Sequence, residues 1–170
     1  MYKVLDTKRI NELLLLRKGW FSPEYELTDK AENYGQLSYN GLTRWRGIAT
    51  TANTTWIFQR EGLFSRTIWI MDENGMQIGK ATRELFERRM LLTLQTGFQA
   101  EFYRPSIWSR EYVWESAGYG KIMHIDSYPF SLKDSIYIDQ SMAPSALLPL
   151  LIFFGAHLTI LQRRRRAAHY

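Results

Sequence analysis

The chain carries one run of side chains suited to binding an anion: four consecutive arginines near its C-terminus, Arg163, Arg164, Arg165 and Arg166. Guanidinium groups donate paired hydrogen bonds to phosphate and carboxylate oxygens, and a short cationic cluster beside an apolar segment suits anionic lipid. The plainest alternative is a solvated helix terminus. Two isolated lysines, Lys80 and Lys121, are weaker candidates for the same chemistry. The sequence thus predicts a contact to anionic phospholipid or to a protein partner through these six residues.

Residues that commonly carry catalysis occur here without the spacing that catalysis needs. The chain has no cysteine, which excludes disulfides, a thiolate nucleophile and cysteine-ligated zinc. His124 and His157 have no second ligand at helical spacing, and no serine lies in a Gly-x-Ser-x-Gly sequence. Glu111 and Glu115 flank a predicted strand, as surface charges do. We expect a non-enzymatic protein without a metal or other cofactor.

The charge of the chain is concentrated in the arginine run. The sequence has 22 basic and 17 acidic residues and a net charge of +5. Without the four arginines, 18 basic residues face 17 acidic ones, and the net charge falls to +1. Proteins that bind nucleic acid usually distribute basic residues along a face. The sequence therefore predicts a local basic tail and no nucleic-acid partner.

The arginines follow an apolar segment, residues 146–161, whose sixteen residues carry no charge. As an α-helix this segment is about 24 Å long and apolar around its whole circumference. Such a helix either lies in a protein core or crosses a bilayer, although a span needs about 20 apolar residues. Ser145 is a candidate N-cap for the core helix, and Pro144 and Pro149 fall before or within its first turn.

The chain before this segment consists of short alternating or apolar runs separated by turn residues such as Asn40-Gly41. Residues 8–18 are predicted to form a short helix outside the sheet, capped by Asp6 or Thr7. The runs that we predict as strands are residues 25–28, 34–39, 44–51, 54–60, 67–72, 76–82, 90–95, 98–103, 111–115, 121–126 and 135–139.

We expect a mainly β fold: a closed antiparallel barrel of about twelve strands around a buried hydrophobic C-terminal helix, with the short N-terminal helix outside. Eight strands fill a barrel with their own side chains, whereas about twelve leave a lumen that a helix can occupy. The predicted parts of this single domain, residues 1–170, are an N-terminal helix or extension (1–23), barrel strands (24–139), a central helix (144–162) and a basic tail (163–170). The first residues lack a signal-peptide pattern, so we expect a cytoplasmic protein, peripheral at the inner face of a membrane.

The order of these elements resembles the tubby-like superfamily, in its LURP-one-related and phospholipid-scramblase-like branch. The resemblance is carried by the strand-turn-strand at 67–80, the connection at 83–89, the strand at 90–95, and residues 137–139 that lead into the apolar helix. It implies the same closed barrel and a function at membranes, as in phosphoinositide binding by tubby proteins and lipid movement by scramblases. The basic phosphoinositide pocket of tubby proteins has no residue-by-residue match here, and no calcium-loop pattern occurs.

The function that the sequence predicts is therefore a lipid-binding, membrane-surface-binding or protein-interaction module. The alternative is a cytosolic β-domain tethered by a transmembrane helix over residues 146–161 and acting as a scaffold.

Overall fold

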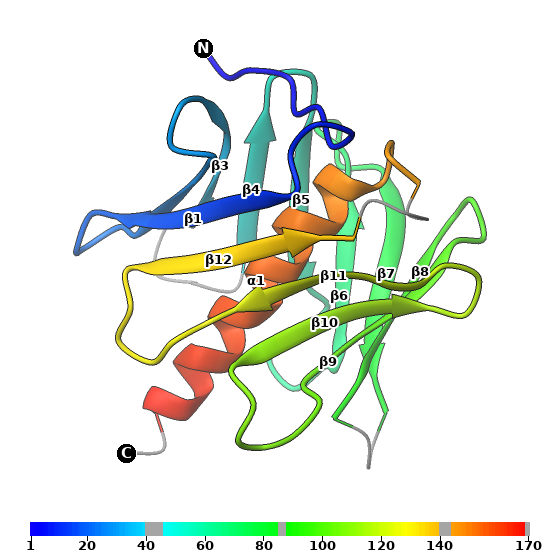
Figure 1. Ribbon diagram of the computed structural model, residues 1–170. Coiled ribbons are helices and arrows are strands. Elements are labelled where there is room, and N and C mark those ends of the chain that lie inside the picture. The colour runs from blue at the N-terminus through cyan, green and yellow to red at the C-terminus, as the bar shows by residue number, and fades with distance from the viewer. Residues whose placement is uncertain (40–45, 85–87, 140–143, 169–170) are drawn as a thin grey trace.

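A computed structural model describes residues 1–39, 46–84, 88–139 and 144–168, which form a closed barrel of twelve antiparallel strands around one helix (Figure 1). The elements are β1 (Glu12–Lys18), β2 (Glu24–Thr28), β3 (Asn33–Tyr39), β4 (Arg46–Thr51), β5 (Thr55–Arg60), β6 (Thr67–Met71), β7 (Gln77–Arg83), β8 (Met90–Leu94), β9 (Gln99–Tyr103), β10 (Glu111–Ser116), β11 (Gly120–Asp126), β12 (Lys133–Ile138) and α1 (Leu148–Ala167).

The barrel has the simplest closed topology, because every strand pairs antiparallel with the next one along the chain and β12 returns to pair with β1. The described connections that follow odd-numbered strands therefore lie at one end of the barrel. The helix α1 starts after β12 at the opposite end and runs back through the barrel. Its last turn emerges on the side where the β1–β2 and β11–β12 loops project, at the lower left of Figure 1.

The strands form because apolar residues recur with the two-residue period of a half-buried strand. In β12, Asp134, Ile136 and Ile138 are buried toward the helix, whereas Ser135 and Tyr137 alternate with them and are half-buried on the outer face. The same period in the other strands lines the lumen with apolar side chains, so the barrel and α1 share one core.

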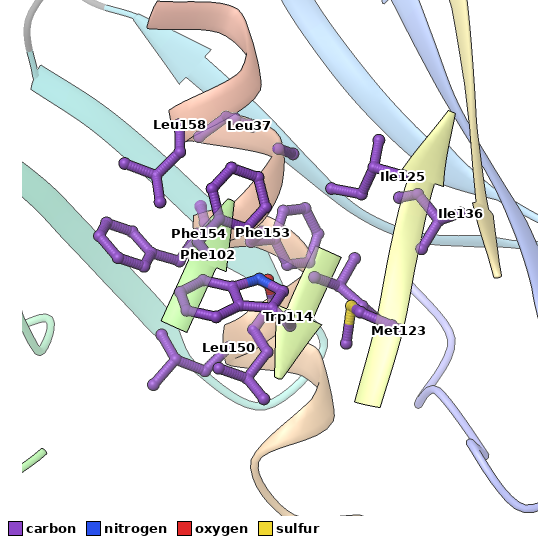
Figure 2. Close-up of a cluster of buried hydrophobic side chains, with 14 of the residues drawn as sticks. Leu37, Phe102, Trp114, Met123, Ile125, Ile136, Leu150, Phe153, Phe154 and Leu158 are labelled. Carbon is purple, nitrogen blue, oxygen red and sulfur yellow. The ribbon is translucent and has the colours of Figure 1, made fainter. Parts of the chain in front are cut away.

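The helix α1 is the centre of that core. Every residue from Leu150 to Leu161 is buried, as the all-round apolar pattern predicts. The indole Nε1 of Trp114 donates a 2.9 Å hydrogen bond to the carbonyl oxygen of Leu151, which ties β10 to the helix. Figure 2 shows the Trp114 ring among the buried hydrophobic side chains of the barrel and α1. The prediction of a core helix is confirmed. Among the described residues, no helix combines the length and hydropathy that crossing a bilayer requires.

The predicted N-terminal helix over residues 8–18 is wrong, because residues 12–18 form β1. Leu13 and Leu15 point into the core, and β1 supplies the strand that closes the barrel between β12 and β2. The eleven predicted strands match β2 to β12. The Asn40-Gly41 turn and the predicted start of the next strand at Arg44 lie outside the described residues.

The predicted ends of the C-terminal helix also differ from the structure. Leu147, not Ser145, occupies the N-cap position, without a side-chain hydrogen bond, and Pro149 lies in the first turn as expected. The helix continues to Ala167, so residues 163–166 are helical rather than a tail. Arginine is a good helix former, and its charge is favourable at the negative end of the helix dipole. Residues 169–170 of the predicted tail lie outside the described part of the chain.

Candidate functional site

Arg163, the first arginine of the run, forms an ion pair with Asp134, a buried residue of β12. Its Nη2 lies 2.6 Å from Oδ2 of Asp134, and its Nη1 lies 3.3 Å from Oδ1. Asp134 is only 2% exposed. Burial raises the pKa of Asp134, and the charge of Arg163 opposes that rise. Arg163 therefore neutralises a buried carboxylate on β12 and is structural in this arrangement.

Arg164 also packs against the barrel. Its guanidinium lies 4.3 Å from the ring centroid of Tyr39 at the end of β3, a cation–π contact. The hydroxyl of Tyr39 lies 2.8 Å from Nδ1 of His157 inside the lumen. Burial, with the charge of Arg164 nearby, lowers the pKa of His157 to about 3, so this histidine is neutral. Arg164 thus covers a polar pair in the core.

The last two arginines of the run have no ion pair with a carboxylate among the described residues. Arg165 is half-buried and lines a cavity between α1 and the barrel wall, whereas Arg166 is exposed. The four arginines therefore differ in role. Arg163 and Arg164 contact the barrel, whereas Arg165 and Arg166 are placed where an external anion can reach them.

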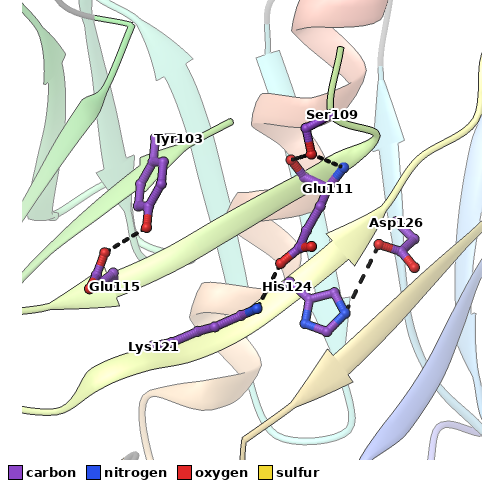
Figure 3. Close-up of polar contacts among 7 residues, drawn as sticks. All are labelled: Tyr103, Ser109, Glu111, Glu115, Lys121, His124 and Asp126. Atoms are coloured by element: carbon purple, nitrogen blue, oxygen red, sulfur yellow. Dashed lines mark hydrogen bonds and ion pairs between the residues drawn. The ribbon is translucent and has the colours of Figure 1, made fainter. Parts of the chain in front are cut away.

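The two lysine candidates lie on the outer wall, apart from the arginine run. Lys121 reaches along β11 to Glu111 of β10, with 2.7 Å between Nζ and Oε1 (Figure 3). The Nζ atom of Lys80, on β7, lies 5.9 Å from the centroid of the Trp69 ring. Glu111 and Glu115 are both held in surface contacts, since Glu115 accepts a 2.6 Å hydrogen bond from the hydroxyl of Tyr103 (Figure 3). The structure does not bring either lysine together with the arginines.

The expectation that the positive charge is only a local tail is wrong, because loops distant in the sequence add cations around the last turn of α1. We call this face the arginine end. Its described residues are 19–23, 61–66, 84, 88–89, 104–110, 127–132 and 163–168. They include nine arginines and two glutamates, whereas the described loops and termini of the opposite end carry four basic and six acidic residues. The barrel is electrostatically polarised along its axis.

A cavity of about 510 Å³ opens at the arginine end, between the last turns of α1 and the wall from β5 to β8. Its apolar lining includes Ile68, Met90, Leu158 and Leu161. Five arginines line it as well, against a single acidic side chain, Glu84, among the described residues; they are Arg60, Arg66, Arg83, Arg88 and Arg165. We call this space the arginine cavity.

Large hydrophobic side chains project from the same end. Of the fourteen exposed large hydrophobic residues in the described part of the chain, nine belong to the loops of the arginine end. We call them the apolar tips: Trp20, Phe21, Leu63, Phe64, Ile107, Trp108, Tyr128, Phe130 and Leu132. Phe64 and Phe130 are 96% and 103% exposed, so these rings meet solvent on nearly all sides.

Hydrogen bonds brace the loops that carry these tips. The guanidinium of Arg104 donates to the carbonyl oxygens of Ile107 and Ser109, which fixes the turn that presents Trp108. Arg60 Nε donates a 2.8 Å hydrogen bond to the carbonyl oxygen of Ser65 beneath Phe64. Phe130 has a φ of 64°, a left-handed conformation that is unfavourable for a bulky residue. The loops that present Trp108 and Phe64 are therefore braced by side-chain hydrogen bonds within the protein itself.

Comparison with models of protein families, with curated proteins and with solved structures finds no match to this chain. The fold itself, a closed twelve-stranded barrel with one C-terminal helix, is consistent with a tubby-like fold.

The arginine run could be identified from the sequence as a candidate anion contact, whereas the loop arginines and the apolar tips were not predicted. A usable signal is nevertheless present in the sequence: in a barrel whose strands follow one another in order, the loops after odd-numbered strands share one end. Summing the charged and aromatic residues over alternate loops predicts the arginine end from the sequence and the strand order alone.

Proposed function

We propose that this protein is a peripheral membrane-binding module that docks its arginine end on an anionic phospholipid surface. The observation that carries the proposal is the coincidence of nine exposed hydrophobic side chains and nine arginines on one end of a rigid barrel. Monomeric proteins rarely gather exposed apolar groups unless the surface meets a partner or a membrane.

A lipid surface fits this combination of groups. Tryptophan and other aromatic rings favour the headgroup level of a bilayer, where one edge is apolar and the other is hydrated. Each lysine or arginine close to an anionic surface contributes about 1 kcal/mol, an attraction that salt screens. The apolar tips would enter the headgroup region while the surrounding arginines contact lipid phosphates. The resemblance to the tubby-like superfamily, whose members act at membranes, supports the same proposal.

The test is co-sedimentation of the full chain with vesicles of phosphatidylserine and phosphatidylcholine, compared with a tip variant, Trp20→Ser, Phe64→Ser, Trp108→Ser and Phe130→Ser. These four rings are among the most exposed side chains, so their loss should leave the barrel folded. We expect the tip variant to bind at least about tenfold more weakly, since affinity scales with the apolar area that is buried.

A matched control removes exposed apolar groups from the opposite end, with Val4→Ser, Met76→Ser and Tyr119→Ser. This variant should bind like the wild type. Equal weakening by both variants, or no binding of the wild type to phosphatidylserine vesicles, would contradict the proposal and direct the search to a protein partner for the same surface.

A further inference from the structure

Among the described residues, the lining of the arginine cavity holds more positive than negative charge. Arg60, Arg66, Arg83, Arg88 and Arg165 line it with Glu84 as the only acidic lining residue among those described. Within the same described part of the chain, Arg66, Arg83, Arg88 and Arg165 form no ion pair with a carboxylate. Like charges close together repel one another, and a bound anion would offset that repulsion.

Arg83 has the least favourable environment of these arginines. Its Nε is buried and has no hydrogen-bond partner among the described residues. Burial and the charges of Arg165, Arg66 and Arg60 lower the pKa of Arg83. A buried donor without an acceptor is unfavourable, and an oxygen ligand that accepts a hydrogen bond from Nε would remove that cost. Arg83 is thus an unsatisfied donor in a cationic cavity.

The shape and field of the cavity suit a compact anion with several oxygens. Its volume of about 510 Å³ lies within the range of small-ligand sites. The C-terminal end of α1 contributes about half a negative charge, far less than five guanidinium groups. Arginine pairs with phosphate oxygens through two parallel hydrogen bonds, so several arginines around one space suit a group with more than one negative charge.

We propose that the arginine cavity is a specific site for a phosphomonoester or diphosphate group, held by Arg83 and Arg165 with Arg66 and Arg88 at its rim. The group can come from a lipid headgroup or from a soluble phosphate compound. The inference rests on the proposed membrane function only for the lipid source; the site itself follows from the cavity and its arginines.

The first arm of the test is calorimetric titration of the full chain with inorganic pyrophosphate. The wild type should bind in a saturable manner. A cavity variant, Arg83→Gln with Arg165→Gln, should lose at least about tenfold in affinity, because it removes two charge-assisted hydrogen-bond donors. A control with the same change in charge, Arg110→Gln with Lys133→Gln, removes one exposed cation of the arginine end and one next to it, at the start of β12. Neither residue lines the cavity, so this control should bind pyrophosphate as the wild type does.

The stability of the cavity variant provides an internal check. Because it removes two mutually repelling charges, its thermal midpoint should equal or exceed that of the wild type, so lost binding cannot be attributed to unfolding. A second variant, Arg66→Gln with Arg88→Gln, changes exposed residues at the rim and should weaken pyrophosphate binding without touching buried groups.

The second arm distinguishes the two sources of the phosphate group. Vesicles of phosphatidic acid, whose headgroup is a phosphomonoester, are compared with phosphatidylserine vesicles of equal surface charge. A preference of the wild type for phosphatidic acid that the cavity variant loses, while its binding to phosphatidylserine persists, assigns the site to lipid. Pyrophosphate binding without this preference assigns it to a soluble compound.

The inference is overturned if pyrophosphate does not saturate the wild type and phosphatidic acid gives no preference, or if the cavity variant behaves as the wild type in both arms. Failure of the proposed membrane function looks different: neither kind of vesicle binds the wild type, whatever the result with pyrophosphate.

Discussion

His157 makes the stability of the protein depend on pH. It lies fully inside the barrel, stacked against Tyr39 with 5.6 Å between ring centroids, and burial lowers its pKa to about 3. In the unfolded chain, histidine ionises near pH 6.5. Below that pH, His157 of the unfolded chain binds a proton. His157 of the folded protein stays neutral until the pH approaches about 3. The contribution of His157 to stability is therefore complete above about pH 6.5 and is lost as the pH falls through this window.

We expect the free energy of unfolding of the wild type to decrease between pH 6.5 and 4 by about 1.4 kcal/mol per pH unit from this residue. The double variant His157→Leu with Tyr39→Phe removes the titrating group and its buried partner together, and its slope should be shallower by that amount. Urea denaturation at a series of pH values measures both slopes. Identical slopes would show that His157 does not remain neutral in the fold.

Arg163 is the arginine whose loss should damage the fold rather than binding. Its partner Asp134 is 2% exposed, and removing one member of a buried ion pair costs about 3–5 kcal/mol because the other charge stays buried. We expect Arg163→Gln to destabilise the barrel by that amount, and Asp134→Asn with Arg163→Gln to recover much of the loss.

Chemical denaturation of the two single variants and the double variant measures this coupling. If Arg163→Gln has the same small effect in the presence and absence of Asp134, the pair is not a structural contact. A vesicle-binding experiment that replaced all four arginines of the run would mix this loss of stability with any loss of lipid contact, so variants that test binding must retain Arg163.

At the scale of the elements, the fit between α1 and β10 depends on a glycine. A Cβ built on Gly155 would lie 2.6 Å from Nε1 of Trp114 and 3.1 Å from Cδ1 of Ile125. Gly155→Ala should force the indole away from the helix and strain its hydrogen bond to Leu151. Overpacking costs about 1–3 kcal/mol, against about 1 kcal/mol that alanine gains in a helix interior.

We therefore expect Gly155→Ala to lower the midpoint of thermal unfolding. Gly118→Ala is the matched control, because a Cβ there has no atom within 4 Å. A midpoint that rises with Gly155→Ala would mean that β10 does not pack this closely on the helix.

The strand pattern and the central helix could be predicted from the sequence because both are periodic or uniformly apolar over their whole length. β1 was the exception. Four consecutive leucines, residues 13–16, satisfy a buried strand and one side of a short helix equally well. Only the closed barrel, which needs a partner for both β12 and β2, decides for the strand. The intrinsic preferences of these residues for helix or strand do not show that β12 and β2 both need β1 as a partner.

At the scale of the whole molecule, closure of the barrel creates the candidate site. Arg60 ends β5, Arg83 ends β7, and Arg165 lies far along the chain in α1, yet all three line one cavity. The sequence identified the arginine run as a possible anion contact. It could not show that the first two arginines are held by Asp134 and Tyr39, since those contacts depend on which residues face the lumen.

The polarity of the barrel also predicts a strong effect of salt. Raising ionic strength from about 0.1 M to about 1 M shortens the screening length from about 10 Å to about 3 Å. Binding to phosphatidylserine vesicles should therefore weaken by more than about tenfold. The variant Arg17→Gln, Arg110→Gln, Lys133→Gln and Arg166→Gln should show a shallower salt dependence, because it removes four exposed cations: two of the arginine end, and two in β1 and β12 next to the β11–β12 loop. Vesicle co-sedimentation over a salt series measures both. Binding that does not respond to salt would assign the attachment to the apolar tips alone.

The most direct test of the account is which end of the barrel meets the membrane. Because the chain has no cysteine, a single bimane label can be placed at Ser22→Cys on the arginine end or at Ala52→Cys on the opposite end, both at exposed positions. Each labelled protein is bound to phosphatidylserine vesicles that contain lipids with a quencher near the headgroup. Docking through the arginine end predicts strong quenching at position 22 and little at position 52. Quenching at position 52, or none at position 22 in vesicle-bound protein, would contradict docking through the arginine end.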